Sequence, residues 1–523
     1  MRIEGYLEES AKAHPDKVAL CCDGRRHTYE EVENAANALA WGLAEQGIES
    51  RDRVAIVLDN SIETVCSIFA ILKVGASFVV FASRTKADRL IDLLNQFGAS
   101  ALVTDAGGAA ILGDRCQCIR SLKAILIAGQ GSQIAGAASV QPVFFSEISR
   151  RYKNSPKYEQ KPASDLDPAA LVYTSGSTGN PKTVVLTHSN IHTTTTAVVN
   201  YLANTCDDVV LNLLPLSHTY GLSQLMTSFN AGATLILERA FRGPREVMQM
   251  MIQENVTGVG LIPVIAAALV DLDLKTFACP RLRYVTNAAG ALPVPVIRTL
   301  QAAWPHVRIF CMYGLTECMR ASFLPPDQID VRPTSVGRGL PGQEMYIVDE
   351  EGRRVGPGLM GELVVRGANV MKEYWGLPEE TAKVLRDGPY PNEKVLYTGD
   401  LFTMDEDGYF YFVSRRDDII KTCGKKVSPA QVENVLCSLE GVAEAAVVGI
   451  PDKILGQAIK AVIRAKTGMQ LTQRQVIRHC AEYLDDFMVP TLVEFRSTLP
   501  RTASGKVERH RLTGKENYAA WRG

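Results

Sequence analysis

The chain has 523 residues, with 56 basic and 57 acidic side chains and a formal net charge of −1. A single hydrophobic core stops growing at roughly 250–300 residues, so we expect at least two domains. Because charges of both signs are intermixed along the chain, its composition gives no indication of binding to nucleic acid or to an anionic membrane surface.

Targeting signals and paired cysteines are not evident in the sequence. The first ten residues lack the apolar core of a signal peptide, and no apolar run approaches the roughly 20 residues that a transmembrane segment needs. The 12 cysteines are scattered and form no CxxC pair. We therefore expect a reduced, cytoplasmic protein with free thiols, acting as a monomer or a homodimer.

The N-terminal half alternates between helical and strand patterns. Thr28 and Glu31 have the spacing of a capping box, which predicts a helix that runs to about residue 47. The apolar patterns then predict strands at 54–58, 77–81 and 101–104 and helices at 61–73 and 87–97. This βαβ alternation continues to about residue 300 and predicts an α/β fold with a largely parallel, helix-covered sheet. A Gly/Ala/Ser-rich segment at 129–139 is typical of a surface loop.

The C-terminal half has a different pattern. Residues 347–412 alternate short strands with turns, which predicts a small β-rich subdomain. After the adjacent charges at 416–418 a compact α+β segment follows, with helices expected near 429–439 and 472–484 and strands at 443–449 and 458–464. We therefore predict a large domain at 1–416 and a small domain at 417–523.

The most informative segment is YTSGSTGNPK at 173–182. Glycines allow backbone N–H groups to approach phosphate oxygens, hydroxyl groups add donors, and Lys182 adds a positive charge. Predicted strands at 169–173 and 184–186 flank the segment, so the loop joins two strands. It differs from GxxxxGK[ST] because Asn180 and Pro181 separate Gly179 from Lys182.

Four later segments add candidate ligand-binding groups. In YGLTE at 313–317, Tyr313 can stack on a purine, Thr316 can bind phosphate, and Glu317 is an oxygen ligand suited to Mg²⁺. In YTGD at 397–400, Asp400 can accept hydrogen bonds from ribose hydroxyls. Segments 414–421 and 500–506 carry further basic residues. Each segment taken alone also fits a solvated turn.

In this order, the five segments resemble those of the adenylate-forming superfamily, which includes acyl- and aryl-CoA ligases, firefly luciferases and nonribosomal adenylation domains. Further matches are PLSH at 215–218, NAAGAL at 287–292 and GELVVRG at 361–367. The resemblance implies a large AMP- and acid-binding domain followed by a small, mobile C-terminal domain. It also implies that a carboxylic acid attacks the α-phosphate of ATP to give an acyl-adenylate and pyrophosphate, and that a thiol then displaces AMP.

The resemblance also implies a role for individual residues. Asp417 takes the position of a hinge, and Lys506 bridges the acid carboxylate and the α-phosphate during adenylation, where it acts as a cation. Gly424 lets the pantetheine arm of CoA pass, and Lys426 meets nucleotide phosphates of CoA. Thr316 meets the α-phosphate and Glu317 the Mg²⁺. The implied ATP-binding residues are Thr174, Ser175, Gly176, Ser177, Thr178, Gly179 and Lys182 for the β- and γ-phosphates, Ala288, Ala289, Gly290 and Tyr313 for adenine, and Asp400 and Arg415 for ribose.

The identity of the acid is less legible. Relatives that activate α-amino acids hold the ammonium group with an aspartate, whereas His218, Thr219, Tyr220 and Gly221 provide no acidic side chain. Gly314 stands where acetyl-CoA synthetases carry a tryptophan. Together with Gly221, Gly258 and Gly260, it indicates room for a medium or long acyl, or an aryl, acid. His218 gates the pocket or orients the acid, or it is a structural histidine.

Three functions follow from these expectations. The first is an AMP-forming ligase that transfers the acyl group to CoA. The second transfers it to the phosphopantetheine thiol of a carrier protein. The third is a non-catalytic nucleotide-binding relative, which the presence of Glu317, Asp400, Arg415 and Lys506 argues against.

Overall fold

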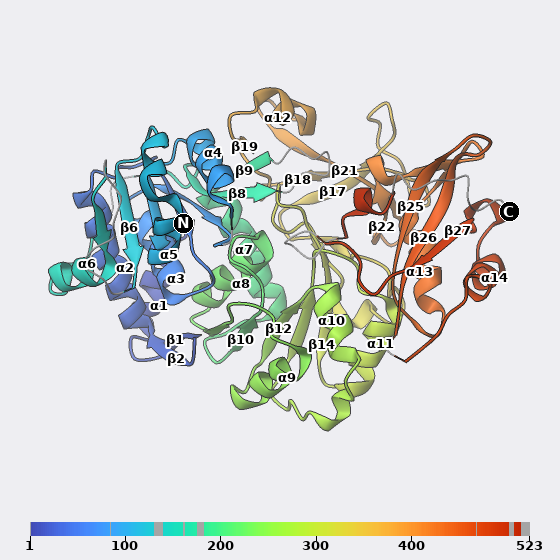
Figure 1. Ribbon diagram of the computed structural model, residues 1–523, viewed down its shortest axis with the longest axis horizontal. Helices are drawn as coiled ribbons and strands as arrows, with labels where there is room; N and C mark the ends of the chain where they lie inside the picture. The colour runs from blue at the N-terminus through green and yellow to red at the C-terminus, as the bar shows by residue number, and fades with distance from the viewer. Residues whose placement is uncertain are drawn as a thin grey trace.

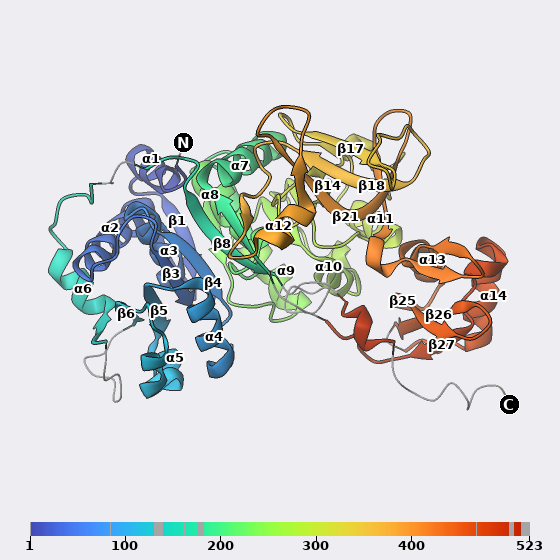
Figure 2. The same cartoon turned by 90° about the horizontal axis from the view of Figure 1, so that it is seen from above.

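The computed structural model describes residues 2–83, 85–129, 140–159, 163–174, 182–466, 468–501 and 507–513. A large N-terminal domain contains three β-sheets, and a small C-terminal domain with its own sheet lies at one end of the molecule (Figures 1 and 2). The predicted fold class, a mixed α/β large domain with a β-rich subdomain and a small α+β C-terminal domain, is confirmed.

The first sheet of the large domain carries the predicted phosphate segment near one edge. The strands predicted at 54–58, 77–81 and 101–104 are confirmed, and all three pair in parallel. In spatial order the strands are β19 (Glu373–Tyr374), β9 (Lys182–Thr187), β8 (Pro168–Thr174), β4 (Ser77–Phe81), β3 (Arg53–Val57), β5 (Ala101–Asp105), β6 (Ala124–Ala128) and β7 (Pro142–Phe144).

The alternation of helices and strands predicted one largely parallel sheet, whereas the structure contains two sheets of this kind. The N-terminal hairpin joins the second sheet, because β1 pairs in parallel with β11 more than 200 residues later. No local pattern in the sequence indicates that pairing. In spatial order this sheet contains β16 (Arg338–Gly339), β15 (Ser322–Phe323), β14 (Arg308–Tyr313), β13 (Tyr284–Asn287), β12 (Gly258–Leu261), β10 (Val209–Asn212), β11 (Thr234–Leu237), β1 (Val18–Cys22) and β2 (Arg25–Thr28).

Helices connect the strands of both sheets. The predicted capping box is confirmed: the Thr28 hydroxyl accepts a hydrogen bond from Glu31 N at 3.1 Å, and Thr28 N donates to the Glu31 carboxylate at 2.9 Å. The helices of the large domain are α1 (Gly5–Ala13), α2 (Tyr29–Glu45), α3 (Ile62–Lys73), α4 (Ala87–Phe97), α5 (Ala106–Leu112), α6 (Phe145–Tyr152), α7 (His188–Leu202), α8 (Thr219–Asn230), α9 (Pro244–Gln253), α10 (Pro263–Val270), α11 (Val294–Ala303) and α12 (Pro378–Val384).

The β-rich subdomain and the C-terminal domain complete the chain. The subdomain is an antiparallel sheet of β17 (Glu344–Val348), β18 (Gly361–Arg366), β20 (Leu385–Asp387), β21 (Lys394–Met404) and β22 (Phe410–Arg415). The C-terminal domain contains β23 (Ile420–Thr422), β24 (Lys425–Val427), α13 (Pro429–Ser438), β25 (Val442–Asp452), β26 (Gly456–Ala465), α14 (Gln473–Tyr483) and β27 (Leu492–Phe495). Its helices and strands include those predicted near 429–439, 443–449, 458–464 and 472–484.

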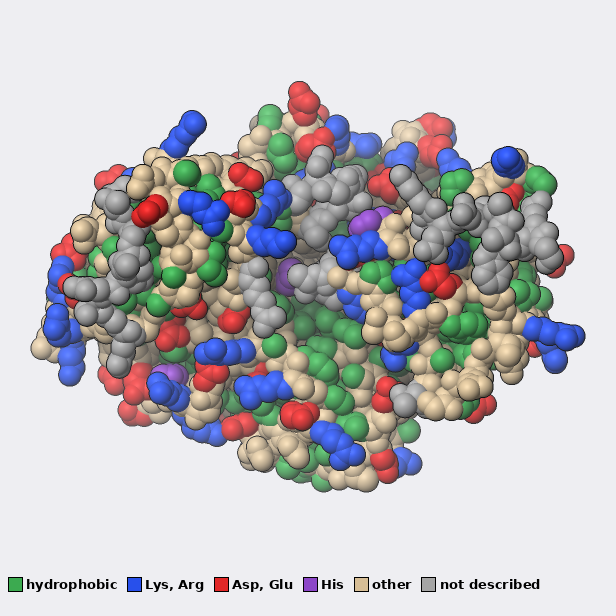
Figure 3. All heavy atoms as spheres, viewed as in Figure 1, with side chains coloured by type: hydrophobic (Ala, Val, Ile, Leu, Met, Phe, Trp, Pro, Cys, Tyr) green, Lys and Arg blue, Asp and Glu red, His purple; other side chains and the backbone are tan. Residues whose placement is uncertain are grey.

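The junction between these parts is a short 3₁₀ turn, Arg416–Asp418, directly after β22, and Asp417 is exposed there. The exact domain boundary at 416–417 stays a prediction. Acidic and basic side chains are intermingled over the face seen in Figure 3, as the sequence composition indicates. Within the part of the chain that is described, no helix combines the length and apolarity needed to span a membrane.

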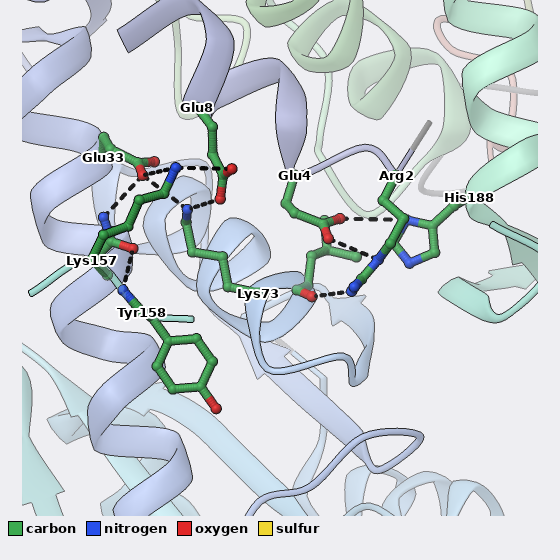
Figure 4. Close-up of polar contacts among 10 residues, drawn as sticks. Arg2, Glu4, Glu8, Glu33, Lys73, Lys157, Tyr158 and His188 are labelled. Carbon is green, nitrogen blue, oxygen red and sulfur yellow. Dashed lines mark hydrogen bonds and ion pairs between the residues drawn. The ribbon is translucent and has the colours of Figure 1, made fainter. Parts of the chain in front are cut away.

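A buried lysine at the end of the third helix forms ion pairs with carboxylates of the first and second helices (Figure 4). The Lys73 side chain at the end of α3 is fully buried, and its Nζ lies 2.5 Å from Glu8 Oε1 and 2.9 Å from Glu33 Oε1. Burial alone would raise the pKa of Glu8, but the charges of Lys73 and Lys157 outweigh it, so this pKa is lowered. Lys157 reaches the same carboxylates from the solvent side, with 56% of its side chain exposed.

We expect Lys73→Met to destabilise the protein by about 3 kcal/mol, because it leaves two partly buried carboxylates without their central cation. Lys157→Met is the matched control and is expected to cost about 1 kcal/mol or less, since exposed ion pairs contribute little. Urea denaturation at neutral pH measures both changes. Equal effects of the two substitutions would contradict the role given to burial.

Glu4, Arg2 and His188 form a second buried cluster beside the first. The Glu4 carboxylate lies 2.8 Å from Arg2 Nε and 3.6 Å from His188 Nδ1. Burial raises the pKa of Glu4 to about 7, and burial also lowers the pKa of His188 to about 3. The folded protein therefore favours a neutral Glu4 and a neutral His188 near pH 6.

The raised pKa of Glu4 predicts a pH dependence of stability. Between pH 4.5 and about 7 the folded state holds a proton on Glu4 that the unfolded state has released, so this contribution to stability is complete below pH 4.5 and is lost as the pH rises. The free energy of unfolding of the wild type, minus that of Glu4→Gln, should fall by about 3 kcal/mol over this window. His188 is present in both proteins.

Urea titrations at several pH values measure this difference. Glu9→Gln, a change of an exposed neighbour on the same helix, is the control and should show no comparable trend. A difference between wild type and Glu4→Gln that does not change with pH would rule out the shifted pKa.

Candidate functional site

Strands β8 and β9 form an antiparallel hairpin, and the predicted phosphate segment lies between them in the sequence. Thr174 and Lys182 are cross-strand partners at its base, and Thr174 Oγ1 donates to the Lys182 carbonyl oxygen at 3.0 Å. The residues between them, which include the predicted Ser175, Gly176, Ser177, Thr178 and Gly179, lie outside the described part of the chain. The two strands that the sequence predicts on either side of the segment are therefore confirmed.

Lys182 is held by a carboxylate and an aromatic ring. Its Nζ lies 2.7 Å from Glu380 Oε2 and 4.9 Å from the centre of the Tyr374 ring. Hydrogen bonds from Lys182 and Lys383 lower the pKa of Glu380 to about 2. This ion pair gives the charge of Lys182 a fixed position at the start of β9.

Tyr374 also contacts the second predicted motif. Its hydroxyl donates to Glu317 Oε1 at 2.6 Å, and Met371 N donates to the Glu317 carbonyl oxygen at 2.7 Å. Burial raises the pKa of Tyr374, so the hydroxyl keeps its proton. Tyr374 belongs to the two-residue strand β19, which pairs with β9. Tyr374 therefore contacts both Lys182 at the start of β9 and the carboxylate of Glu317.

Sequence reasoning missed Tyr374 and Glu380. They lie almost 200 residues after Lys182 in the chain, in the segment EYWGLPEE at 373–380. Nothing local marks the segment as part of the site, because the short strand β19 becomes visible only through its pairing with β9. An aromatic pair followed by acidic residues was the available signal.

Tyr313, Asp400 and Arg415 form the second part of the candidate site. The Tyr313 hydroxyl donates to Asp400 Oδ2 at 2.6 Å, and Arg415 Nη1 lies 3.0 Å from Asp400 Oδ1. Asp400 and Arg415 are cross-strand partners on β21 and β22. Burial and the Asp400 charge raise the pKa of Tyr313. A direct hydrogen bond therefore joins Tyr313, predicted to bind adenine, to Asp400, predicted to bind ribose. The sequence did not indicate this contact.

The segment predicted to line adenine follows the neighbouring strand. Ala288 is buried, Ala289 has φ +68°, and Gly290 is exposed. Strands β13 and β14 are parallel neighbours, so Ala288 and the YGLTE segment leave the same edge of the sheet. Thr316 is half-buried in the turn after β14. Together these segments place the predicted nucleotide groups along one edge.

His218 occupies the N-cap position of α8 without a capping hydrogen bond from its side chain, and Thr219 is the first residue of that helix. Tyr220, one residue later, has its hydroxyl 2.8 Å from Thr286 Oγ1 on β13. This contact places the N-terminal end of α8 against the strand that leads to Ala288.

The sequence predicted space for a large acid beside four glycines, and other atoms of the protein fill that space. A Cβ on Gly221 would meet the Pro215 carbonyl oxygen, one on Gly258 the Tyr284 ring, and one on Gly260 the Gln224 amide. A Cβ on Gly314 would meet the backbone of Met319 and Arg320. These glycines are therefore explained by close packing, and they are not evidence for a large cavity. Their place in an acid pocket stays a prediction.

The groups expected to meet CoA lie in the C-terminal domain. Gly424 is in the turn between β23 and β24 with φ +73°, and no atom lies within 4 Å of the position that a Cβ would take. Lys426 Nζ lies 3.0 Å from Glu350 Oε1 of the large domain, and both side chains are largely exposed. Lys506 is outside the described residues, so its predicted role is not tested by the structure.

The described residues contain no group of three or more His, Cys, Asp or Glu side chains placed to hold a metal ion. Glu317 nevertheless fits Mg²⁺, because this ion is commonly bound through one or two carboxylates together with substrate phosphates. Its hydrogen bond from Tyr374 also fixes the orientation of the carboxylate.

Comparison with protein-family models places these residues in a known family. The AMP-binding enzyme model matches residues 7–375, and the AMP-binding enzyme C-terminal domain model matches residues 431–506. The chain belongs to the AMP-binding enzyme family, which is part of the adenylate-forming superfamily.

Individual relatives match over almost their whole length. A long-chain-fatty-acid–CoA ligase of Bacillus subtilis is 30% identical, with 98% of this chain and 94% of the relative covered. A feruloyl-CoA synthase of Amycolatopsis is 32% identical, with 95% of each chain covered. A 2-succinylbenzoate–CoA ligase of Geobacillus is 29% identical, with 98% of this chain and 97% of the relative covered.

Solved structures show the same fold. An anthranilate CoA ligase, AuaEII, in complex with anthranoyl-AMP has a TM-score of 0.88 and 28% identity, with 98% of this chain and 96% of that chain covered. The o-succinylbenzoate CoA synthetase of Bacillus subtilis, in complex with its acyl-adenylate intermediate, has a TM-score of 0.81 and 27% identity, with 98% of each chain covered.

Proposed function

We propose that the protein is an AMP-forming acid–thiol ligase that converts a carboxylic acid and ATP to an acyl-adenylate and pyrophosphate, and then transfers the acyl group to CoA with release of AMP. The observation that carries the proposal is the pair of contacts made by Tyr374. This residue joins a lysine at the base of a phosphate-type loop to a carboxylate suited to Mg²⁺.

The chemistry explains why these groups are needed. A carboxylate is a poor electrophile because its leaving group would be oxide, whereas the acyl-adenylate can release AMP. Charge builds up on the phosphates during the transfer, and preorganised cations stabilise that charge. Lys182 and the loop hold the β- and γ-phosphates, Thr316 meets the α-phosphate, and Lys506 bridges it to the acid. Mg²⁺ on Glu317 supplies additional positive charge.

The remaining groups hold the nucleoside. Asp400 accepts hydrogen bonds from the ribose hydroxyls, with Arg415 beside it, and Tyr313 packs against adenine together with the segment at 288–290. The direct Tyr313–Asp400 hydrogen bond supports this assignment, because it fixes the two groups relative to each other before ATP binds. Preorganisation of this kind reduces the entropy lost on binding.

We further propose that the acid is a medium or long acyl, or an aryl, carboxylic acid, and that His218 at the N-terminal end of α8 orients it. CoA is the favoured acceptor because the relatives that match over nearly full length are named CoA ligases or synthases. In this proposal the C-terminal domain turns about Asp417 after adenylation and brings Gly424 and Lys426 to the site. The phosphopantetheine thiol of a carrier protein is the second candidate acceptor.

Tyr374→Phe tests the positioning of Glu317. The change removes the hydrogen bond to Glu317 and keeps the aromatic ring over Lys182. We expect the Mg²⁺ concentration for half-maximal pyrophosphate release to rise about 10-fold, since loss of a group that orients a metal ligand typically costs 10–100-fold.

Two further variants sharpen this test. Tyr374→Leu, which also removes the ring, should in addition raise the KM for ATP. Tyr411→Phe is the matched control, because Tyr411 donates to the Asp405 carboxylate at 2.9 Å outside the candidate site. An unchanged Mg²⁺ requirement in Tyr374→Phe would exclude this role for the hydroxyl.

The proposed reaction is tested with a panel of alkyl, aryl and amino acids. Acid-dependent pyrophosphate release is expected, followed by AMP and an acyl-CoA thioester in equal amounts when CoA is added, as measured by mass spectrometry. Parallel assays with holo-carrier proteins compare the acceptors. If no acid in a broad panel gives pyrophosphate while AMP still binds, the non-catalytic alternative is favoured.

A further inference from the structure

Arg320 is a buried cation for which the site described so far gives no use. Only 3% of the residue is exposed. It lies three positions after Glu317, and its Cα lies against Gly314. The centre of its guanidinium group lies 5.2 Å from the centre of the Tyr220 ring. Among the described residues no carboxylate forms an ion pair with it, and its Nε–H has no acceptor, although the group hydrogen-bonds the neutral Tyr201 hydroxyl.

An arginine remains charged inside a protein, and a buried charge without a counter-charge is costly. The two tyrosines beside Arg320 do not supply a negative charge. Burial raises the pKa of Tyr201 to about 12 and also raises the pKa of Tyr220, so both hydroxyls stay neutral. The contact with the Tyr220 ring offsets only part of the cost. The environment of Arg320 therefore favours an anionic ligand.

A second buried polar group lies on the same helix face as Tyr220. Gln224 follows Tyr220 by one helical turn and is 7% exposed. Its Nε2 donates to Asn212 Oδ1 at 3.2 Å, whereas its Oε1 has no donor among the described residues. The Gln224 amide also fills the space beside Gly260. This end of the region lined by α8 is therefore polar.

The position of these groups relates them to the proposed acid site. Tyr220 follows His218 by two residues, and its hydroxyl hydrogen-bonds Thr286, which precedes the adenine segment by two residues. Arg320 leaves the turn that presents Thr316 and Glu317 to the nucleotide. The contact with Tyr220 places the guanidinium group against the N-terminal end of α8, beside the residues expected to line the acid site.

We propose, on the basis of the function proposed above, that Arg320 binds a second carboxylate at the far end of the substrate, so that the enzyme activates one end of a dicarboxylic acid. The planar guanidinium matches a carboxylate with two parallel hydrogen bonds. An unsubstituted alkyl or aryl end packed against the guanidinium group would leave its charge without a counter-charge and its Nε–H without an acceptor.

Matched acid pairs test the proposal: hexanoate, 6-hydroxyhexanoate and adipate; octanoate and suberate; benzoate and isophthalate. Pyrophosphate release gives kcat/KM for each acid. In the wild type at least one diacid should exceed its monoacid by about 10-fold or more. Arg320→Met should lower kcat/KM for that diacid by about 100-fold and leave the value for the monoacid equal or higher. Arg320→Lys should retain part of the preference.

Arg338→Met is the matched control, because Arg338 also lies over a tyrosine ring, at 4.2 Å from Tyr409, but outside the proposed pocket. Its ratio of diacid to monoacid should equal that of the wild type. Binding of AMP and circular dichroism report whether each variant is folded. If Arg320→Met fails to fold, the wild-type ratios still decide whether a diacid is preferred, and a changed ratio in Arg320→Lys tests the role of Arg320.

Each outcome bears on a different claim. A wild type that prefers monoacids or the hydroxy acid overturns the inference and leaves the proposed ligase function intact. A diacid preference that survives Arg320→Met overturns the role of Arg320. If no acid of any series releases pyrophosphate although AMP binds, the proposed ligase function fails, and the inference fails with it.

Discussion

The candidate site depends on the pairing of the two-residue strand β19 with β9, the strand that follows the predicted phosphate segment. Strand β19 adds to the edge of the first sheet and carries Tyr374 into contact with both Lys182 and Glu317. Lys182 comes from the first sheet, and Glu317 follows a strand of the second. Through Tyr374, groups from the two sheets therefore lie together, and the proposed function uses this lysine and this carboxylate to hold the phosphates.

The site is largely preorganised through hydrogen bonds between its own groups. Asp400 bonds Tyr313 and pairs with Arg415, Glu317 accepts from Tyr374, and Lys182 pairs with Glu380. Such pairs give the polar groups of the free protein partners within the site. In the proposed function the Lys182–Glu380 pair opens when a phosphate binds, whereas the Tyr313–Asp400 bond persists.

Local sequence patterns predicted individual elements well. The capping box at Thr28 and Glu31 and the strands at 77–81 and 101–104 all agree with the structure, because each depends on neighbours within a few residues. The pairing of β1 with β11, the contacts of Tyr374 and the packing around Gly258 and Gly260 depend on residues far apart in the chain. A glycine in a sequence suggests open space because it has no side chain, and only the folded structure shows which neighbouring atoms fill that space.

Acid-dependent exchange of labelled pyrophosphate into ATP, measured without CoA, tests the central claim most directly. Exchange reports reversible formation of an acyl-adenylate before any thiol is present. The account predicts exchange only when a suitable acid is added, and a loss of about 100-fold or more in Glu317→Gln, in which the metal-binding carboxylate is replaced by a neutral amide. Exchange that requires CoA, or that persists undiminished in Glu317→Gln, would contradict it.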